Sequence, residues 1–103
     1  MANYYTDHPE FDFYLNHPEM KRVVELKERN FEDKDKYEDA PVDFDDAIEN
    51  YKRVLDITGD IAANILEPNS EEVDLEGPHL VEGRMHYASK TYENIEATRK
   101  AGL

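Results

Sequence analysis

The sequence predicts an all-α fold, a small helical array around one long helix at about residues 43–66, with a short β-hairpin near residues 80–87. Between Phe44 and Leu66 the apolar residues recur mostly at steps of three and four, which places them on one broad stripe of a helix. No strand period fits that pattern. Two short half-apolar runs on either side of Glu82-Gly83 are typical of a tight hairpin.

Capping and breaking residues predict the ends of the long helix. Asp43 is a favourable N-cap, and acidic residues follow it in the first turn, where the helix dipole favours negative charge. Pro68 disfavours helical geometry at the residue before it, so we expect the helix to end near Leu66. Gly59 lies at the edge of the apolar stripe. A glycine there either permits the close approach of a second helix or is simply tolerated.

Two shorter helices are expected before the long one. Residues 1–6 show no periodicity and are expected to be loose. The segments Asp7-His-Pro-Glu10 and Asn16-His-Pro-Glu19 share the spacing of a capping box, with an N-cap residue followed by Glu at the third helical position. Proline is tolerated in a first turn because its missing N–H is not needed there. We therefore expect helices at about residues 8–15 and 17–30.

Two connecting loops and a last helix complete the expected fold. Residues 30–42 are highly charged and contain a proline near their end, and residues 67–79 are rich in Pro, Gly, Asn and Ser, so both read as surface loops. Ser89 or Thr91 is expected to cap a last helix at about residues 91–101. The whole chain, residues 1–103, is expected to form a single helical segment.

Composition limits the classes of partner. The net charge of −13 argues against nonspecific binding to nucleic acid or to an anionic membrane, because like charges repel. The sequence has no cysteine, hence no disulfide framework, and no apolar run long enough to span a membrane. The N-terminus lacks the basic and apolar regions of a signal peptide, so a cytoplasmic location is expected.

The residues themselves predict no catalytic, cofactor-binding or metal-binding site. His8 and His17 stand near the starts of different helices, without a second histidine at helical spacing. His79 and His86 lie on the two arms of the expected hairpin and can face each other, but nothing nearby in sequence completes a metal site. No nucleophile–base pair or phosphate-binding loop is present, which argues against a self-contained small enzyme.

The order of helix ends and turns resembles a known family. A long amphipathic helix, a glycine-ended acidic segment, a tight turn and a last helix follow one another, after an N-terminal extension of similar pattern. The motifs are Tyr14-Leu-Asn-His-Pro-Glu-Met20, Ala40-Pro-Val-Asp-Phe44, Ile65-Leu-Glu-Pro-Asn69, Val73-Asp-Leu-Glu-Gly77, Val81-Glu-Gly-Arg-Met85 and Lys100-Ala-Gly-Leu103. This pattern is similar to the N-terminal part of acyl-CoA dehydrogenases, in the subgroup with an extended N-terminus.

The resemblance implies a parent flavoenzyme that oxidises acyl-CoA to 2-enoyl-CoA with FAD. In that family a middle β-domain and a C-terminal helical domain hold the flavin, and the catalytic glutamate comes far later in the chain. The 103-residue segment would then be structural and non-catalytic by itself, and no site residue or cofactor is expected within it. The apolar Leu103 with no polar tail also suggests a cut inside a longer chain.

Two further expectations concern partners. The stripe of the long helix is wider than one neighbouring helix can cover, so the segment is expected to pack against the remainder of its parent chain or to form a homo-oligomer. The alternative function is a free-standing acidic helical module that binds a protein partner, including a mimic of DNA. Against a DNA mimic, Lys and Arg are interspersed with the acidic residues throughout the chain.

Overall fold

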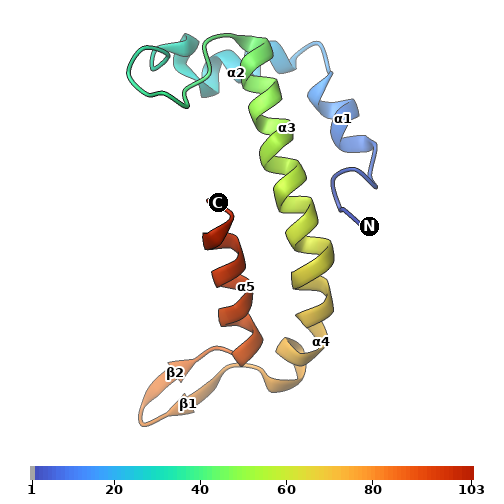
Figure 1. Ribbon diagram of the computed structural model, residues 1–103, viewed down its shortest axis with the longest axis vertical. Helices are drawn as coiled ribbons and strands as arrows, with labels where there is room; N and C mark the ends of the chain where they lie inside the picture. The colour runs from blue at the N-terminus through green and yellow to red at the C-terminus, as the bar shows by residue number, and fades with distance from the viewer. Residues whose placement is uncertain (1) are drawn as a thin grey trace. The chain divides into compact units, whose positions relative to one another are not determined.

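The computed structural model describes residues 2–103 and shows a largely all-α chain, as predicted (Figure 1). It is 61% helical, with one long helical run of 33 residues and a two-stranded antiparallel hairpin. The elements in chain order are α1 (Glu10–Leu15), α2 (Met20–Lys27), a 3-10 turn η1 (Arg29–Phe31), α3 (Phe44–Ile61), a π-helical turn η2 (Ala62–Leu66), α4 (Glu67–Glu76), β1 (His79–Val81), β2 (Arg84–His86) and α5 (Ser89–Lys100).

The chain divides into two compact units, whereas the sequence suggested a single segment. One unit is His8–Leu55 and contains α1, α2 and most of α3. The other joins Met1–Asp7 to Asp56–Leu103 and contains the end of α3, α4, the hairpin and α5. The boundary between them falls inside α3.

The start of α3 confirms Asp43 as the N-cap. Its Oδ1 accepts the backbone N–H of Asp46 at 2.9 Å. The Asp46 carboxylate in turn accepts the backbone N–H of Val42 at 3.1 Å. The first bond satisfies an N–H group that the first helical turn leaves without an intrahelical partner, and the second ties the residue before the cap to the same turn.

The predicted end of the long helix was wrong. The helical run does not stop near Leu66 but continues through α4 to Glu76, so residues 67–79 are mostly helix and not a loop. Pro68 is accommodated because it occupies the first turn of α4, directly after the wide π-helical turn η2. A π-turn shifts the hydrogen-bond register, which relieves the missing N–H and the ring clash that proline causes inside a regular α-helix. The run ends at Gly77, which has a positive φ of 61°.

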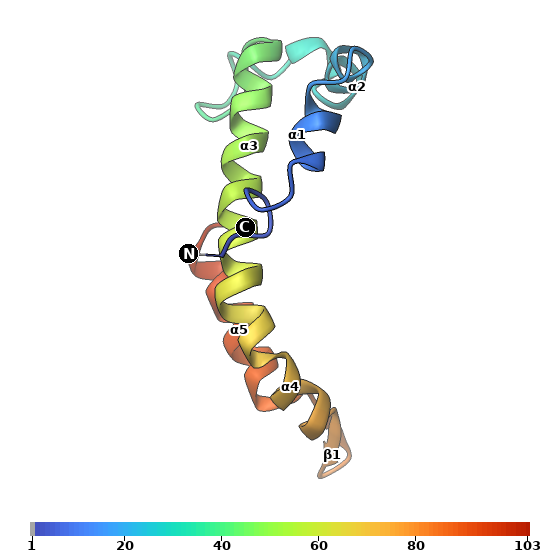
Figure 2. The same ribbon diagram turned by 90° about the vertical axis from the view of Figure 1, so that its right-hand side faces the viewer.

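Residues 1–6 were expected to be loose; residue 1 lies outside the described residues, and residues 2–6 form a turn that bonds to α3. Asn3 holds a turn, because its Oδ1 accepts the N–H groups of Tyr5 at 2.8 Å and Thr6 at 3.1 Å. Its Nδ2 donates to the carbonyl and to Oδ1 of Asp56, at 3.0 and 3.1 Å. Figure 2 shows this segment, the darkest blue, beside α3.

Gly59 is the point at which this turn meets α3. The N–H of Tyr4 donates to the Gly59 carbonyl at 3.1 Å. A Cβ at residue 59 would lie 2.3 Å from Asn3 Oδ1 and 2.6 Å from Tyr5 N, which is far inside van der Waals contact. The glycine therefore permits a close approach, but of the N-terminal turn and not of a second helix.

The first two helices are shorter than expected, and their capping boxes are not formed. α1 has Pro9 at its N-cap position and α2 has Glu19, and neither helix has a side-chain cap hydrogen bond. The Glu19 N–H instead donates to Nδ1 of His17 at 3.0 Å. α2 ends at Lys27 because Arg29, Asn30 and Phe31 take left-handed backbone angles, which a right-handed helix cannot continue.

The hairpin has the predicted turn. His79 pairs with His86, Leu80 with Met85 and Val81 with Arg84. Glu82 and Gly83 form the two-residue turn with φ of 52° and 79°, both in the left-handed region that such turns require. The His79 and His86 rings stack with their centroids 6.0 Å apart, so the two histidines do face each other.

The hairpin returns the chain alongside η2 and α4 as α5 (Figure 1). Ile61, Ala63 and Ala88 are buried in this unit. The buried Asn69 donates to Asn94 Oδ1 at 2.8 Å and to Glu93 Oε1 at 3.3 Å. α5 begins at Ser89, where neither Ser89 nor Thr91 serves as the N-cap. Instead, Glu76 of α4 accepts the Ser89 N–H at 2.8 Å and places its charge at the helix N-terminus.

We predict that Gly59→Ala destabilises the chain. Alanine normally favours a helix interior by about 1 kcal/mol over glycine. Here the new Cβ collides with the Asn3–Tyr5 turn, so we expect a net loss of about 1–3 kcal/mol in the free energy of unfolding. Chemical denaturation followed by circular dichroism measures it.

Deletion of residues 2–6 is the control for this prediction. Without the turn, the same Gly59→Ala change should raise stability by up to about 1 kcal/mol, because only helix propensity remains. A stabilising effect in the intact chain would contradict the packing described.

Candidate functional site

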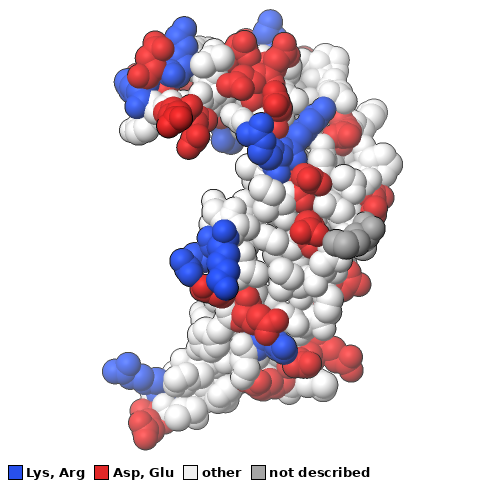
Figure 3. Space-filling model, in the orientation of Figure 1, with Lys and Arg blue, Asp and Glu red and all other residues white. Residues whose placement is uncertain are grey.

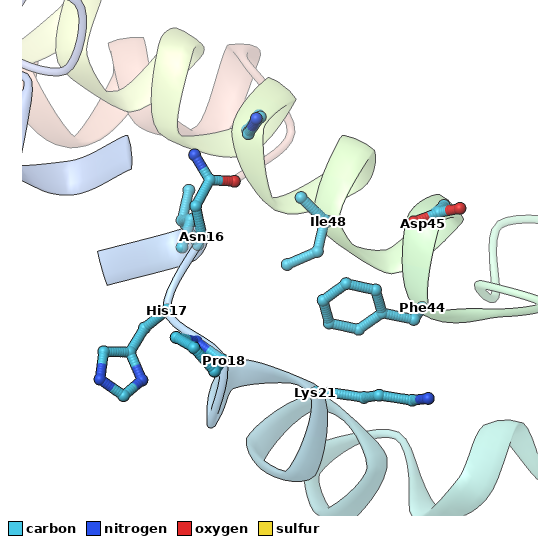
Figure 4. Close-up of a pocket in the computed structure, with 9 residues that line it drawn as sticks. Asn16, His17, Pro18, Lys21, Phe44, Asp45 and Ile48 are labelled. Atoms are coloured by element: carbon cyan, nitrogen blue, oxygen red, sulfur yellow. The ribbon is translucent and has the colours of Figure 1, made fainter. Parts of the chain in front are cut away.

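The candidate site is a pocket in the His8–Leu55 unit, between the α1–α2 connection and α3 (Figure 4). Its volume is about 410 Å³. The residues that line it are Leu15, Asn16, His17, Pro18, Lys21, Phe44, Asp45, Ile48 and Lys52.

Phe44 and Ile48 form part of the apolar lining. They are one helical turn apart on α3 and point toward the chain around Pro18, as Figure 4 shows. Both side chains are half-buried, as is Leu15 at the end of α1. Lys52 follows Ile48 by four residues, so the helix carries it onto the same face.

The polar lining has an excess of hydrogen-bond donors. Lys21, Lys52 and the Asn16 amide contribute N–H groups, and Asp45 contributes the one carboxylate. In Figure 4 the Asp45 carboxylate points away from Ile48, and the His17 ring points away from Phe44. Within residues 2–103 neither Lys21 nor Lys52 forms an ion pair or a side-chain hydrogen bond, and neither does the Asn16 amide.

Neither lysine pairs with the acidic residues that stand one helical turn from it. On α3, Lys52 has acidic residues at both Glu49 and Asp56, but Glu49 pairs with Arg53 at 3.4 Å and Asp56 accepts from Asn3. Lys21 has His17 and Pro18 one turn before it and Glu25 one turn after it, and it forms no ion pair with Glu25. The pocket is therefore locally cationic in a strongly acidic chain.

A second group of residues lies where α2 meets α3 in the same unit. The Tyr51 hydroxyl donates to the Glu28 carboxylate, and the Lys27 ammonium lies 5.0 Å from the centre of the Tyr51 ring. Burial raises the pKa of the Tyr51 hydroxyl well above its ordinary value, and the hydrogen bond and charge of Glu28 raise it further. Beside these residues is a shallow depression of about 490 Å³, lined mainly by apolar atoms that include Val54 and Leu55.

The other unit carries a groove of about 590 Å³ between α3–η2 and α5. Ile57, Ile61 and Ile65 form its floor, and Glu93 and Glu96 line its edge. The pKa of the Glu96 carboxyl is lowered by its hydrogen bond from Arg99, and that of Glu93 by hydrogen bonds from Lys90 and Asn69. These carboxylates are therefore already paired within the chain.

The sequence predicted no site residue, and it did not identify this pocket. Residues 44, 48 and 52 stand at helical spacing on α3, which was a usable signal for a shared face. The partner side of the pocket, at residues 15–21, depends on how α1 and α2 are connected, and periodicity does not contain that information.

The described residues contain neither a metal-binding cluster nor a membrane-spanning helix. No group of three or more His, Cys, Asp or Glu side chains between residues 2 and 103 is placed to hold a metal ion. No helix in that part of the chain is long and apolar enough to cross a membrane. No family model, curated protein or solved structure matches the sequence.

We predict that the Tyr51 hydroxyl ionises above the ordinary range of tyrosine and that its hydrogen bond stabilises the fold. Because its pKa is higher in the folded than in the unfolded chain, this contribution is fully present below about pH 10 and is lost as the pH rises through the folded pKa. Tyr51→Phe should cost about 1 kcal/mol at pH 8, and less above pH 10. Denaturation at both pH values, with absorbance titration at 295 nm, measures both effects.

Tyr37→Phe is the matched control, because Tyr37 is an exposed tyrosine of the same unit. It should leave the high-pH absorbance step of Tyr51 in place. A difference titration of the unmodified chain against Tyr51→Phe that places the Tyr51 ionisation in the ordinary range of tyrosine would show that the hydrogen bond to Glu28 does not form in solution.

Proposed function

We propose that the chain is the N-terminal helical segment of a flavoenzyme resembling the acyl-CoA dehydrogenases. The single observation that supports this proposal is the ordered series of helix-end and turn motifs from Tyr14 to Leu103. In this role the segment is structural. The parent enzyme would oxidise acyl-CoA to 2-enoyl-CoA in the cytoplasm, with FAD and the catalytic base supplied by later domains.

The positions of these motifs in the fold support the proposal. The Val81–Met85 motif forms the hairpin turn, and Ile65–Asn69 spans the junction of η2 and α4, where a proline is admitted into a continuous helix. Val73–Gly77 forms the C-terminal end of α4. The motifs therefore lie where the chain bends or changes register, which are positions that a family fold constrains.

Exposed apolar side chains support a packing role. Val54 is 50% exposed on α3, and Leu75, Leu80 and Met85 are more exposed still. The remainder of a parent chain would cover such surface, and a second copy would cover it when the segment is isolated.

The charge distribution disfavours the alternative of an acidic mimic of DNA. On the face in Figure 3, acidic and basic side chains are interspersed, with no continuous field of one sign. Several cations pair with carboxylates one turn away, such as Arg29 with Asp33 at 2.7 Å and Lys90 with Glu93 at 3.0 Å. Pairing of this kind breaks up the rows of carboxylates that a mimic needs.

We predict that residues 1–103 alone do not bind FAD, whereas a chain extended by its natural downstream sequence does. Reading the gene beyond Leu103 should reveal a continued open frame with a β-rich domain. The isolated segment should leave the fluorescence of titrated FAD unchanged, and the extended protein should purify yellow. Micromolar, stoichiometric quenching by the segment alone, or an extended protein without flavin, would refute the proposal.

We further predict that the isolated segment forms a dimer that tightens between low and moderate salt. Uncovered apolar area drives association at roughly 25 cal/mol per Å². The net charge of −13 opposes it, and salt near 0.15 M screens that repulsion beyond about 8 Å. Sedimentation over a concentration series measures the dimer.

Leu55→Asp should weaken this dimer, because it places a charge among the apolar atoms of α3. Asn30→Asp adds the same charge at an exposed position in η1 and should leave association unchanged. A strict monomer at high micromolar concentration and about 0.15 M salt, where screening is already strong, would show that the segment closes its own core.

A further inference from the structure

We propose that the pocket between the α1–α2 connection and α3 binds a small carboxylate that carries a short apolar body. The proposal concerns only residues of the His8–Leu55 unit and does not depend on the proposed function of the whole chain.

The polar residues of the lining indicate that one end of the ligand is negatively charged. Lys21 and Lys52 are both free of carboxylate partners in the described chain, and the Asn16 amide is free to donate as well. Carboxylates accept hydrogen bonds from ammonium and amide groups, and charge-assisted bonds are the stronger class. Asp45 is the opposing charge at the pocket, and its carboxylate points away from Ile48 (Figure 4).

The apolar residues of the lining indicate that the rest of the ligand is apolar. Leu15, Pro18, Phe44 and Ile48 offer apolar surface, so an inorganic anion would leave much of the pocket without a partner. A volume of about 410 Å³ lies at the small end of the range of roughly 300–1,000 Å³ for ligand sites. A ligand with one short alkyl chain or one ring therefore fits this volume.

Three other places among residues 2–103 suit an anion less well. The groove floored by Ile57, Ile61 and Ile65 is lined by three carboxylates, of Asp60, Glu93 and Glu96, and by one ammonium, of Lys100, so its lining has an excess of acidic groups. At the depression near Tyr51, Lys27 lies 3.5 Å from Glu28, so its charge is already compensated. On the hairpin, His79 is exposed and His86 is half-buried, and neither residue lines the pockets described above.

The test uses hexanoate as the probe with the whole isotope-labelled 103-residue chain. Amide chemical shifts should move saturably at residues 15–21 and 44–52, with a dissociation constant on the order of 1 mM, because Lys21 is exposed, Lys52 is only half-buried and the pocket is open. Hexan-1-ol lacks the charge and acetate lacks the apolar body. Each should bind at least about tenfold more weakly than hexanoate.

The double variant Lys21→Met and Lys52→Met removes both charges and keeps the apolar stems. It should weaken hexanoate binding about tenfold or more and bring it to the level of hexan-1-ol. Lys34→Met removes one exposed lysine elsewhere in the unit and should leave binding unchanged. Circular dichroism checks that the variants keep the helical content.

Three outcomes would overturn the proposal. The first is no saturable shift at these residues up to about 10 mM hexanoate, tenfold above the expected dissociation constant. The second is equal binding of hexanoate and hexan-1-ol, which would indicate an apolar depression without anion selectivity. The third is undiminished hexanoate binding by the double Met variant, which would place the anion elsewhere.

Discussion

The apolar stripe of the helical run from Phe44 to Glu76 is the feature on which both units depend. The buried apolar residues of the described chain are Val24, Ala47, Ile61, Ala63 and Ala88, and three of them belong to that run. Most of the five are small, so burial alone supplies little stabilisation, since the gain scales with the apolar area removed from water. Each unit therefore relies on polar contacts between segments to fix its geometry.

Each of those polar contacts is a hydrogen bond from or to a side chain that links two segments of the chain. The Asn3 side chain hydrogen-bonds both to its own turn and to α3. The buried Asn69 joins α4 to α5, and Glu76 at the end of α4 accepts a hydrogen bond from the first N–H of α5. Tyr51 and Glu28 join α3 to α2 in the other unit. In each case one side chain connects elements that are distant in sequence. Such bonds contribute about 1 kcal/mol each, but they specify which surfaces meet more sharply than apolar contact does.

Local signals in the sequence predicted part of the local structure, although the two capping boxes, which are equally local, did not form. Asp43 as a cap, Glu82-Gly83 as a turn and the stripe of α3 each depend on residues within a few positions, and all three are confirmed. The prediction that the long helix ends near Leu66 was wrong because it relied on Pro68. The π-turn that lets the helix continue past this proline has no simple sequence signature. The roles of Asn3 and Glu76, and the pocket around Lys21 and Lys52, were not predictable because their partners lie 13 or more residues away.

The exposed apolar residues of the hairpin are consistent with a surface that packs against further protein. An isolated two-stranded hairpin is at best marginally stable in water. Here it is held at its base, because α4 and α5 are joined by the bonds from Ser89 to Glu76. Leu80 and Met85 pair across the strands, yet they remain 69% and 63% exposed. Apolar residues fixed in register but left uncovered suit a segment whose hairpin packs against further protein, as the proposed parent enzyme would provide.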